Sequence, residues 1–395
     1  MDFDFNDDQE QLRDAVRKWV SKDFDFERRR GIVKAGGQQG GHSKEVWQSL
    51  ADLGLLGLAV PGDHGGMDMG PVEAMVVMEE LGRGLVLAPY APVALMGVAV
   101  LRDHVPAAVQ AQWLPRIAEG RARLALAYQE RQARYHLDHV SPTAQAQGET
   151  WVLNGSKSLV PVGDELDGVA EAYIVSARVT GAVDDHAGIG LFLVERGTPG
   201  VRVQPHPTQD GSRAAEVTLT QVASTLLVPA LSQGAHPLGG HAVLEHAADI
   251  GIAALCAEAV GAMEQLLAIT VDYLNTRKQF GVVIGSFQAL RHRVADMKMQ
   301  LELARSMSYY ATLKLTAPAA ERRRALSQAK VQLGQSMRFV GQQAIQLHGG
   351  IGVTDEYSAG HYFKRLTAIE LTLGDTLHHL GEVANRMEDT AGVFA

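Results

Sequence analysis

The spacing of hydrophobic residues changes twice along this chain of 395 residues, near residue 120 and again near residue 234. Before residue 120, apolar residues recur every three or four positions, which is the period of an amphipathic helix. Three helices are expected there: one after the capping pair Asn6 and Gln9, one after Ser43, and one over residues 72–81. The stretch 31–41 is rich in glycine and glutamine and predicts a loop.

Between residues 121 and 233 the helical period gives way to short runs of apolar and β-branched residues. Turns rich in glycine, proline and aspartate separate these runs, a pattern typical of a compact β barrel or sandwich. Six strands are expected, over residues 124–128, 150–153, 172–177, 190–194, 200–204 and 215–219.

From residue 234 the pattern is helical again. Helices are expected over about 240–276, from about Phe287, up to His348, and over about 355–390. Four such helices predict a bundle. The fold class is therefore mainly α with a central β domain (α–β–α). It comprises an N-terminal helical domain (1–120), a middle β barrel or sandwich (121–233) and a C-terminal four-helix bundle (234–395).

Composition and charge narrow the class of protein. Hydrophobic residues make up 46% and charged residues 21% of the chain, values typical of a globular protein that folds in water. Because nucleic-acid binders carry basic faces, the net charge of −9 makes such a partner unexpected. A single cysteine, Cys256, excludes an intrachain disulfide, and the acidic N-terminus has no signal-peptide core. We therefore expect a cytoplasmic location.

One apolar stretch raises the question of a membrane. Residues 247–269 are almost all small or apolar, but Asp249, Glu258 and Glu264 interrupt them. Since a spanning helix needs about 20 predominantly apolar residues, we expect a buried core helix here and no membrane span.

The segment Arg277-Lys-Gln-Phe-Gly281 lies at the predicted end of the long helix and carries groups suited to a diphosphate. A guanidinium can hold a diphosphate through two parallel hydrogen bonds, which a lysine cannot reproduce. Gln279 adds an amide, and Phe280 adds a flat apolar surface. Taken alone, the segment also fits a helix end with a dipole-compensating arginine and an exit glycine.

A second segment, Gln346-Leu-His-Gly-Gly350, closes the third helix of the predicted bundle. The Gln346 amide can reach a ribose or diphosphate oxygen, and Gly349 and Gly350 permit close approach of the backbone to a ligand. Taken alone, the segment also fits a simple glycine helix stop. The two segments together, with Ile284-Gly-Ser-Phe-Gln288 after the first, are far more specific than either.

These motifs, in this order and on this α–β–α layout, resemble the acyl-CoA dehydrogenase family over nearly the whole chain. The resemblance implies FAD as cofactor and the removal of hydrogens from C2 and C3 of an acyl-CoA. In such enzymes a carboxylate takes the C2 proton while the flavin accepts hydride from C3. The implied contacts to the adenosine diphosphate of a neighbouring subunit's FAD are Arg277, Gln279, Phe280, Phe287, Gln288, Gln346, Gly349 and Gly350.

The family's two positions for the catalytic base hold no carboxylate in this chain. The usual base precedes a Gly-Thr in the last helix, and the matching position is Leu373, followed by Gly374-Asp375. Other members place the base on the helix that leads into the arginine motif, where this chain has Gly251. Ile252 stands where those members have an arginine.

Three acidic residues near these positions are candidates for a relocated base: Glu370, Asp375 and Asp249. For each there is an alternative. These are a surface ion pair of Glu370 with Lys364 or Arg365, a structural hydrogen bond for Asp375, and a capping or interface role for Asp249. No metal site is expected, because His378 and His379 diverge by about 100° on a helix and no third ligand has suitable spacing.

The half of the site that would hold this chain's own flavin also departs from the family. Where the family has Thr-Glu-Pro followed by Gly-Ser-Asp, this chain has Tyr128-Gln-Glu-Arg-Gln-Ala-Arg134. The family's Trp-Ile-Thr, which lies against the isoalloxazine, falls at about Leu159-Val-Pro161. The chain keeps what it would lend to a partner's FAD and lacks much of what would hold its own.

This division resembles the small subunit of pimeloyl-CoA dehydrogenase and the non-catalytic chains of heterotetrameric steroid-CoA dehydrogenases. It implies a paralogous acyl-CoA dehydrogenase subunit as partner in an α2β2 assembly, an acyl-CoA substrate and electron-transfer flavoprotein as acceptor. Two alternatives stay open. One is a self-sufficient homo-oligomeric dehydrogenase or related flavoprotein oxidase with a relocated base, and the other is a non-enzymatic scaffold of the same fold.

Overall fold

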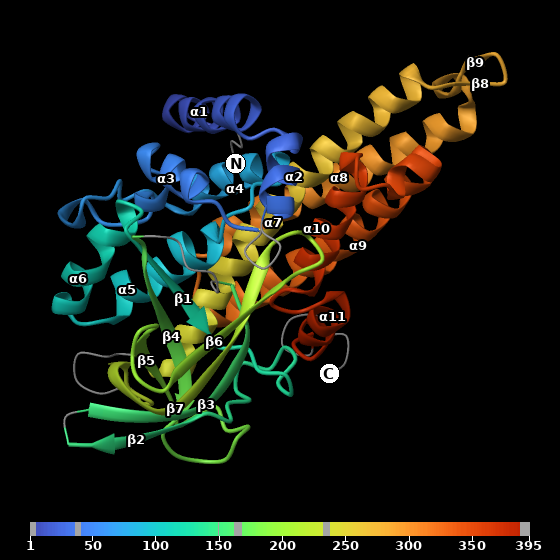
Figure 1. The fold of residues 1–395 in the computed structure, drawn as a ribbon. Helices are drawn as coiled ribbons and strands as arrows, with labels where there is room; N and C mark the ends of the chain where they lie inside the picture. The colour runs from blue at the N-terminus through green and yellow to red at the C-terminus, as the bar shows by residue number, and fades with distance from the viewer. Residues whose placement is uncertain (1–4, 36–40, 149, 162–167, 232–237, 388–395) are drawn as a thin grey trace. The chain divides into compact units, whose positions relative to one another are not determined.

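The structure is a computed structural model and describes residues 5–35, 41–148, 150–161, 168–231 and 238–387 (Figure 1). The chain folds into two compact units, each assembled from segments that are distant in the sequence. The first, here called the helical unit, comprises Met1–Arg30, Pro71–Val86 and Ile252–Ala395. The second, the barrel unit, comprises Gly31–Gly70 and Leu87–Gly251.

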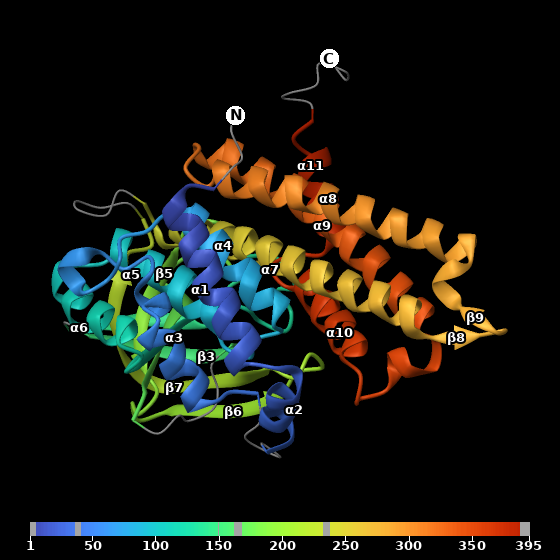
Figure 2. The same ribbon diagram turned by 90° about the horizontal axis from the view of Figure 1, so that it is seen from above.

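The helical unit is built around three long helices that lie side by side in both ribbon views (Figure 1 and Figure 2). These are the larger part of α7 (Gly240–Thr276), α8 (Gln288–Lys314) and α9 (Ala319–His348). Its other helices are α1 (Asp7–Asp23), the start of α2 (Phe26–Ala35), α4 (Pro71–Arg83), α10 (Ser358–Leu371) and α11 (Thr376–Ala384). Between α7 and α8 the chain forms β8 (Lys278–Gln279), β9 (Val282–Val283) and the 3-10 turn η4 (Ile284–Ser286), and η5 (Gly349–Val353) follows α9.

The predicted helix caps are confirmed. The Asn6 side chain accepts a hydrogen bond from the Gln9 backbone N–H (2.9 Å), and the Gln9 side chain accepts one from the Asn6 backbone N–H (3.1 Å). Ser43 Oγ accepts from the Val46 backbone N–H (3.3 Å). These side chains satisfy N–H groups that have no partner inside a helix, and this is why α1 and α3 (Lys44–Asp52) begin where they do.

The loop predicted over residues 31–41 is wrong in its first part, because α2 continues to Ala35. Asp25 Oδ1 accepts from the Arg28 backbone N–H (2.7 Å), and Arg30 pairs with Glu27 one turn earlier (2.8 Å). These contacts offset the cost of a glycine inside a helix, about 1 kcal/mol at Gly31. Residues 36–40 lie outside the described part of the chain.

The single helix predicted over residues 355–390 is also wrong, since the chain breaks it into α10 and α11. Leu373 (φ 58°) and Gly374 (φ 109°) adopt positive φ, which ends a right-handed helix. Asp375 then caps α11 by accepting from the His378 backbone N–H (2.8 Å). The break is invisible in the hydrophobic pattern, because apolar residues keep a helical spacing on both sides of it.

The barrel unit holds a seven-stranded sheet with short helices. Its strands are β1 (Ala122–Ala127), β2 (Thr143–Gln147), β3 (Thr150–Val160), β4 (Ala170–Arg178), β5 (Ile189–Glu195), β6 (Val201–Pro207) and β7 (Arg213–Val228). Its helical segments are the end of α2, α3, η1 (Leu55–Gly57), η2 (Gly62–His64), η3 (Ala91–Gly97, a π-helix), α5 (Val98–His104), α6 (Ala107–Ala118) and the start of α7.

Five of these strands close into a barrel. β4 pairs with β5, β5 with β7, β7 with β3 and β3 with β2, and β2 returns to β4 through Thr143 and Arg178. β1 lies parallel beside β4, and β6 lies antiparallel beside β7. Closure gives each of the five strands at least two pairing partners, which leaves fewer free edges for association with other strands. The predicted central β domain is thereby confirmed.

One strand, β2, escapes the sequence pattern. Its residues Thr-Ala-Gln-Ala-Gln are mostly polar, and only Ala144 is buried. The strand is held by its full antiparallel register with β3, from Thr143 opposite Asn154 to Gln147 opposite Thr150. Backbone pairing therefore defines a strand that hydrophobic alternation does not mark.

Helix α7 is the one helix among the described residues that is long and apolar enough to cross a membrane. Its most apolar window has a mean hydropathy of 1.6 and is 78% buried. Within the helical unit α7 and α4 cross almost backbone to backbone: a Cβ added to Gly261 would collide with the Glu79 carbonyl oxygen, and one added to Gly82 with the Glu258 carbonyl oxygen. α7 is therefore a core helix, as predicted.

Candidate functional site

The predicted diphosphate segment forms the tip of the β8–β9 hairpin between α7 and α8 (Figure 1). Phe280 and Gly281 make the turn, and both have positive φ, 54° and 79°, as in a type I′ turn. This conformation costs a non-glycine residue about 1–2 kcal/mol. The Phe280 ring is nevertheless 91% exposed, 6.2 Å from the half-exposed Phe287 ring, and Gln288 beside it is also exposed. A strained, solvent-facing aromatic ring is typical of a ligand or partner contact.

Arg277 joins α7 to this hairpin. Its backbone N–H donates to the Tyr273 carbonyl (2.9 Å), and its carbonyl accepts from the Ile284 N–H (2.9 Å), so both sides of the hairpin fix its backbone. The side chain is exposed, and within the described part of the chain its guanidinium takes part in no ion pair. Gln279 is likewise exposed, and its amide donates to the neighbouring Lys278 carbonyl (2.8 Å). Arg277 therefore retains its full capacity for an anionic ligand.

The second predicted segment forms the end of α9 and the start of η5. Gln346 lies in the last turn of α9 and is exposed, as are Gly349 and Gly350. Among the described residues, a Cβ added at either glycine would meet nothing within 4 Å, and Gly349 has a positive φ of 62°. The backbone here is open to approach by a group from outside the chain.

An aromatic cluster connects the two segments. The His348 ring lies 4.7 Å from the Tyr273 ring and 5.0 Å from the Tyr357 ring, between centroids. Burial lowers the pKa of His348, and its Nδ1 lies 2.8 Å from the Ala344 carbonyl oxygen. The structure thus brings the two segments to one end of the helical unit. The sequence analysis did not identify Tyr357 as part of this end of the unit. Its neighbour Tyr273, one turn before the arginine motif, was the signal that could have indicated an aromatic cluster here.

The position matching the usual base, Leu373, lies in the corner between α10 and α11. The buried Lys330 amine of α9 fixes this corner from the inside. It donates to the carbonyl oxygens of Ile369 (2.6 Å), Glu370 (3.1 Å) and Thr372 (2.8 Å). Carbonyls at the end of a helix lack partners inside it, and a cation there also complements the helix dipole. The corner is therefore built for rigidity.

Glu370, a candidate for a relocated base, is 8% exposed and therefore not the surface residue that its alternative interpretation assumes. One carboxylate oxygen accepts from the Thr376 backbone N–H (3.1 Å) and from the Thr376 hydroxyl (2.8 Å). The same oxygen lies 3.4 Å from Arg338 Nη2. The carboxylate thus joins the end of α10 to the start of α11, which is a structural role.

Asp375 and the histidine pair also serve the corner. Asp375 caps α11, which is the structural hydrogen bond expected as its alternative. The His379 ring is buried, with Nδ1 3.2 Å from Ser327 Oγ and Nε2 2.9 Å from the Leu373 carbonyl oxygen. Burial lowers the pKa of His379 to about 3, so the imidazole is neutral. The ring therefore holds the corner through hydrogen bonds and not through charge.

The remaining base candidates belong to the other unit. Gly251, the second family position, and Asp249 are both buried in the part of α7 that contributes to the barrel unit. Glu370 and Asp375 belong to the helical unit. The candidates are therefore divided between the two units, with Glu370 and Asp375 both at the α10–α11 corner of the helical unit.

The Lys330 contacts predict an unusual dependence of stability on pH. Burial lowers the pKa of folded Lys330 to about 8 from an ordinary value of 10.5. Between these two values the unfolded chain binds more protons at this residue than the folded chain. We therefore expect the free energy of unfolding to rise with pH across this window, relative to Lys330→Met, by up to about 1.4 kcal/mol per pH unit. Urea unfolding of both proteins at pH 7.5, 8.5 and 9.5 measures this difference, and a pH-independent difference would contradict it.

In the barrel unit, the segment Tyr128–Arg134 is held by a buried ion pair. Lys157 Nζ lies 2.6 Å from Glu130 Oε1 and donates to Ser176 Oγ (2.9 Å) and to the Tyr128 carbonyl (3.3 Å). The Glu130 carboxylate also accepts from the Ser141 backbone N–H (3.1 and 3.3 Å). Burial lowers the pKa of Lys157 to about 8, while the Glu130 charge opposes that shift. The one acid of this segment is thus committed to internal contacts.

The neighbouring positions present apolar or paired side chains to solvent. Leu159 is 47% exposed with a positive φ of 51°. The Ser158 backbone N–H donates to the Gln129 carbonyl (2.8 Å), so the segments around Leu159 and Gln129 are adjacent. Arg131 pairs with Glu216 of β7 (2.7 Å). The two segments are therefore adjacent. Residues Leu159-Val-Pro161 include no aromatic ring that could stack on a flavin and no hydroxyl group.

Comparison with known proteins decides the family. Three models match the chain in order: the acyl-CoA dehydrogenase N-terminal domain over residues 6–121, the middle domain over 125–224 and the C-terminal domain over 239–388. The chain belongs to the acyl-CoA dehydrogenase family. As a member, it is an oxidoreductase that acts on acyl-CoA, with FAD as its cofactor.

Individual acyl-CoA dehydrogenases resemble the chain along most of its length. The mitochondrial isovaleryl-CoA dehydrogenase of Pongo abelii is 29% identical over 307 residues, covering 77% of this chain and 71% of the relative. Acyl-CoA dehydrogenase FadE12 of Mycobacterium tuberculosis is 29% identical over 369 residues, covering 89% and 88%.

Solved acyl-CoA dehydrogenase structures share the fold. The Tcur3481-Tcur3483 steroid ACAD has a TM-score of 0.84 at 28% identity and covers 98% of this chain and 99% of its own. The ChsE4-ChsE5 complex of Mycobacterium tuberculosis has a TM-score of 0.85 at 24% identity, covering 99% and 100%, a likeness of fold alone.

Proposed function

We propose that this acyl-CoA dehydrogenase chain is the non-catalytic subunit of an α2β2 assembly, in which it completes the FAD site of a paralogous subunit. The observation that carries the proposal is the structural use of Glu370 beside Leu373. The Glu370 carboxylate, three residues before the position that matches the family's base, is buried and bonded to Thr376 and Arg338. A general base must be free to reach the proton that it abstracts. The partner subunit would supply the base.

The exposed end of the helical unit supports the second part of the proposal. Arg277 offers a guanidinium that forms no ion pair with the residues that the structure describes, and Gln279 and Gln346 offer exposed amides. This donor set suits a diphosphate and a ribose, with Phe280 and Phe287 as flat surfaces beside it and Gln288, Gly349 and Gly350 completing the contact. When bound, FAD supplies the hydride acceptor of the reaction. These residues would bind and orient its adenosine diphosphate.

The barrel unit supports the assignment of the flavin ring to the partner. Glu130 is committed to Lys157, and Arg131 is paired with Glu216. At the position where family members place an aromatic ring against the isoalloxazine, this chain presents the exposed Leu159. These residues fit a second flavin poorly, so one FAD for each pair of unlike subunits is proposed.

The proposed context follows from the same family. The substrate is an acyl-CoA, the electron acceptor is electron-transfer flavoprotein, and the location is cytoplasmic. The similar structure named Tcur3481-Tcur3483 combines the names of two proteins, which supports a hetero-oligomer. It is a steroid ACAD, which supports a bulky acyl group as substrate. We propose domains at 1–120, 121–233 and 234–395, close to the matched ranges.

Co-purification tests the proposal. The chain alone is expected to bind little FAD, and co-expression with a paralogous subunit is expected to yield a yellow complex with acyl-CoA turnover. In that complex Glu370→Gln and Asp375→Asn should leave kcat within about threefold, because neither carboxylate transfers the proton. Removal of a general base costs about 10²–10⁴-fold. FAD absorbance per chain and turnover with an artificial acceptor are the measurements.

Three results would contradict the proposal. Stoichiometric FAD with turnover by the lone chain would favour a homo-oligomeric enzyme, and a hundredfold loss of kcat in Glu370→Gln would identify a relocated base. A complex that forms without FAD would favour a scaffold. Thermal unfolding of each variant provides the control, because Glu370 also holds the α10–α11 corner.

A further inference from the structure

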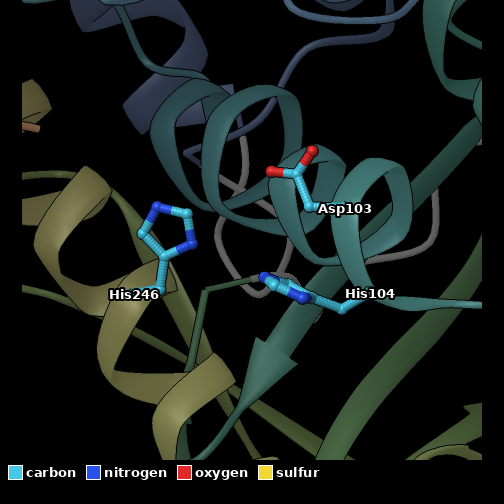
Figure 3. Close-up of side chains that lie close together, drawn as sticks. All are labelled: Asp103, His104 and His246. Atoms are coloured by element: carbon cyan, nitrogen blue, oxygen red, sulfur yellow. The ribbon is translucent and has the colours of Figure 1, made fainter. Parts of the chain in front are cut away.

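Three potential metal ligands converge in the barrel unit. Asp103 and His104 end α5, and His246 lies on the part of α7 that belongs to the same unit. One ligand atom from each side chain lies within 4.8 Å of those of the other two. Figure 3 shows the His104 and His246 rings between the two helices, with the Asp103 carboxylate above them. Residues distant in the sequence thus supply two imidazoles and a carboxylate to one place.

The spacing is close to that of a coordinated metal ion. Imidazole nitrogens and carboxylate oxygens bind Zn²⁺ at about 2.0–2.2 Å, which puts tetrahedral ligand atoms roughly 3.4 Å apart. The three side chains need to close by little more than 1 Å, a distance that small χ rotations supply. The two rings approach edge to face, with centroids 5.8 Å apart and an interplanar angle of 79°. Neither ring is stacked on the other in a way that would block this rotation.

Arg102 orients the carboxylate. Arg102 Nε donates to Asp103 Oδ1 (2.7 Å), and Nη2 donates to Oδ2 (2.8 Å). Its Nη1 donates to the Ala59 carbonyl (3.3 Å), so the guanidinium is itself anchored. A carboxylate has about four acceptor sites, and two remain for a metal after this fork. A hydrogen-bonded carboxylate of this kind is usual around metal ions in proteins.

From this geometry we propose that Asp103, His104 and His246 form a binding site for a divalent transition metal of the zinc class. Two imidazoles favour zinc, cobalt or nickel over magnesium and calcium, which prefer oxygen ligands. Asp103 is exposed and the histidines are half-buried, so solvent reaches the site and water completes the coordination. A bound ion would cross-link α5 to α7 and stabilise the barrel unit.

Metal titration of the untagged full-length chain tests the site. One Zn²⁺ per chain is expected by equilibrium dialysis and elemental analysis, and Co²⁺ should develop the visible absorption of a coordinated ion. His246→Ala and His104→Ala should abolish stoichiometric binding, and Asp103→Asn should weaken it at least tenfold. Because an ion that binds the folded state stabilises it by mass action, Zn²⁺ should raise the Tm of the wild type but not that of His246→Ala.

His241→Ala is the matched control. His241 also lies on α7 in the barrel unit, and its Nε2 is 3.4 Å from His186 Nδ1, so this pair is the competing histidine site. The control should bind Zn²⁺ as the wild type does. Absence of stoichiometric Zn²⁺, retention of it in His246→Ala, or its loss in His241→Ala would overturn the assignment. His246→Gln, with circular dichroism, replaces His246→Ala if the alanine variant fails to fold.

Discussion

Lys157→Met is expected to lower the free energy of unfolding by about 3–5 kcal/mol. The Lys157 side chain is fully buried, and its amine lies 2.6 Å from Glu130. Removing the amine leaves the buried Glu130 carboxylate with hydrogen bonds but without its directly paired charge. An uncompensated buried charge costs far more than the net value of the pair, because the pair has already been desolvated. Urea unfolding at pH 7 measures the loss.

Two further variants locate the cause of this loss. Lys157→Met combined with Glu130→Met should recover much of it, since apolar residues of similar volume often replace a buried pair at little cost. Arg131→Met removes an ion pair whose arginine side chain is 79% exposed, and it should change stability by less than about 1 kcal/mol. Equal losses in Lys157→Met and the double variant would show that packing, not charge, holds this segment.

Arg277→Ala is expected to weaken FAD binding by the proposed complex by about 1.5–3 kcal/mol, which is roughly 10–150-fold in Kd. The guanidinium is exposed and takes part in no ion pair among the described residues, so a diphosphate would gain its whole charge-assisted contact. Stability should change little, because the side chain is exposed and forms no ion pair with the described part of the chain. FAD retention after dialysis, with fluorescence titration of the stripped complex, measures the effect.

The hairpin provides its own control. Lys278 is an exposed cation on the adjacent position of β8, so Lys278→Ala removes the same charge without the planar fork. It should retain FAD almost as the wild type does. Arg277→Lys should fall between the two, because an ammonium cannot form two parallel hydrogen bonds. Equal effects of Lys278→Ala and Arg277→Ala would contradict a specific contact of Arg277 with the diphosphate. They would show that the hairpin attracts FAD only through its positive charge.

Most of the helices and strands were predicted from patterns of residues that are close together in the sequence. The Asn6–Gln9 cap, the ends of α7 and α9 and most strands of the barrel unit follow from side chains within a few residues of each other, which one sequence displays directly. Arg277 and Phe280 are exposed, and their part in a contact outside the chain stays a prediction. The corner at Leu373 did not follow, because its positive φ is imposed by contacts from α9.

The contacts that decide the candidate site are long-range. Lys330 reaches the end of α10 across 39 to 42 positions, and Glu130 meets Lys157 across 27. Nothing in the hydrophobic period marks such partners. The same limit hid the interleaving of segments in the two units and the meeting of His104 with His246. Sequence identified which groups are present, and only the fold showed which of them are already engaged.

The bend at Leu373 is held by contacts to the backbone. Leu373 adopts a left-handed backbone conformation that glycine or asparagine would adopt more readily, and Lys330 and His379 contact the carbonyl oxygens of Thr372 and Leu373. The bend at the position that matches the family's base is therefore present without an acidic side chain. A glutamate at this position would adopt the same bend, because the contacts that hold it are made to the backbone.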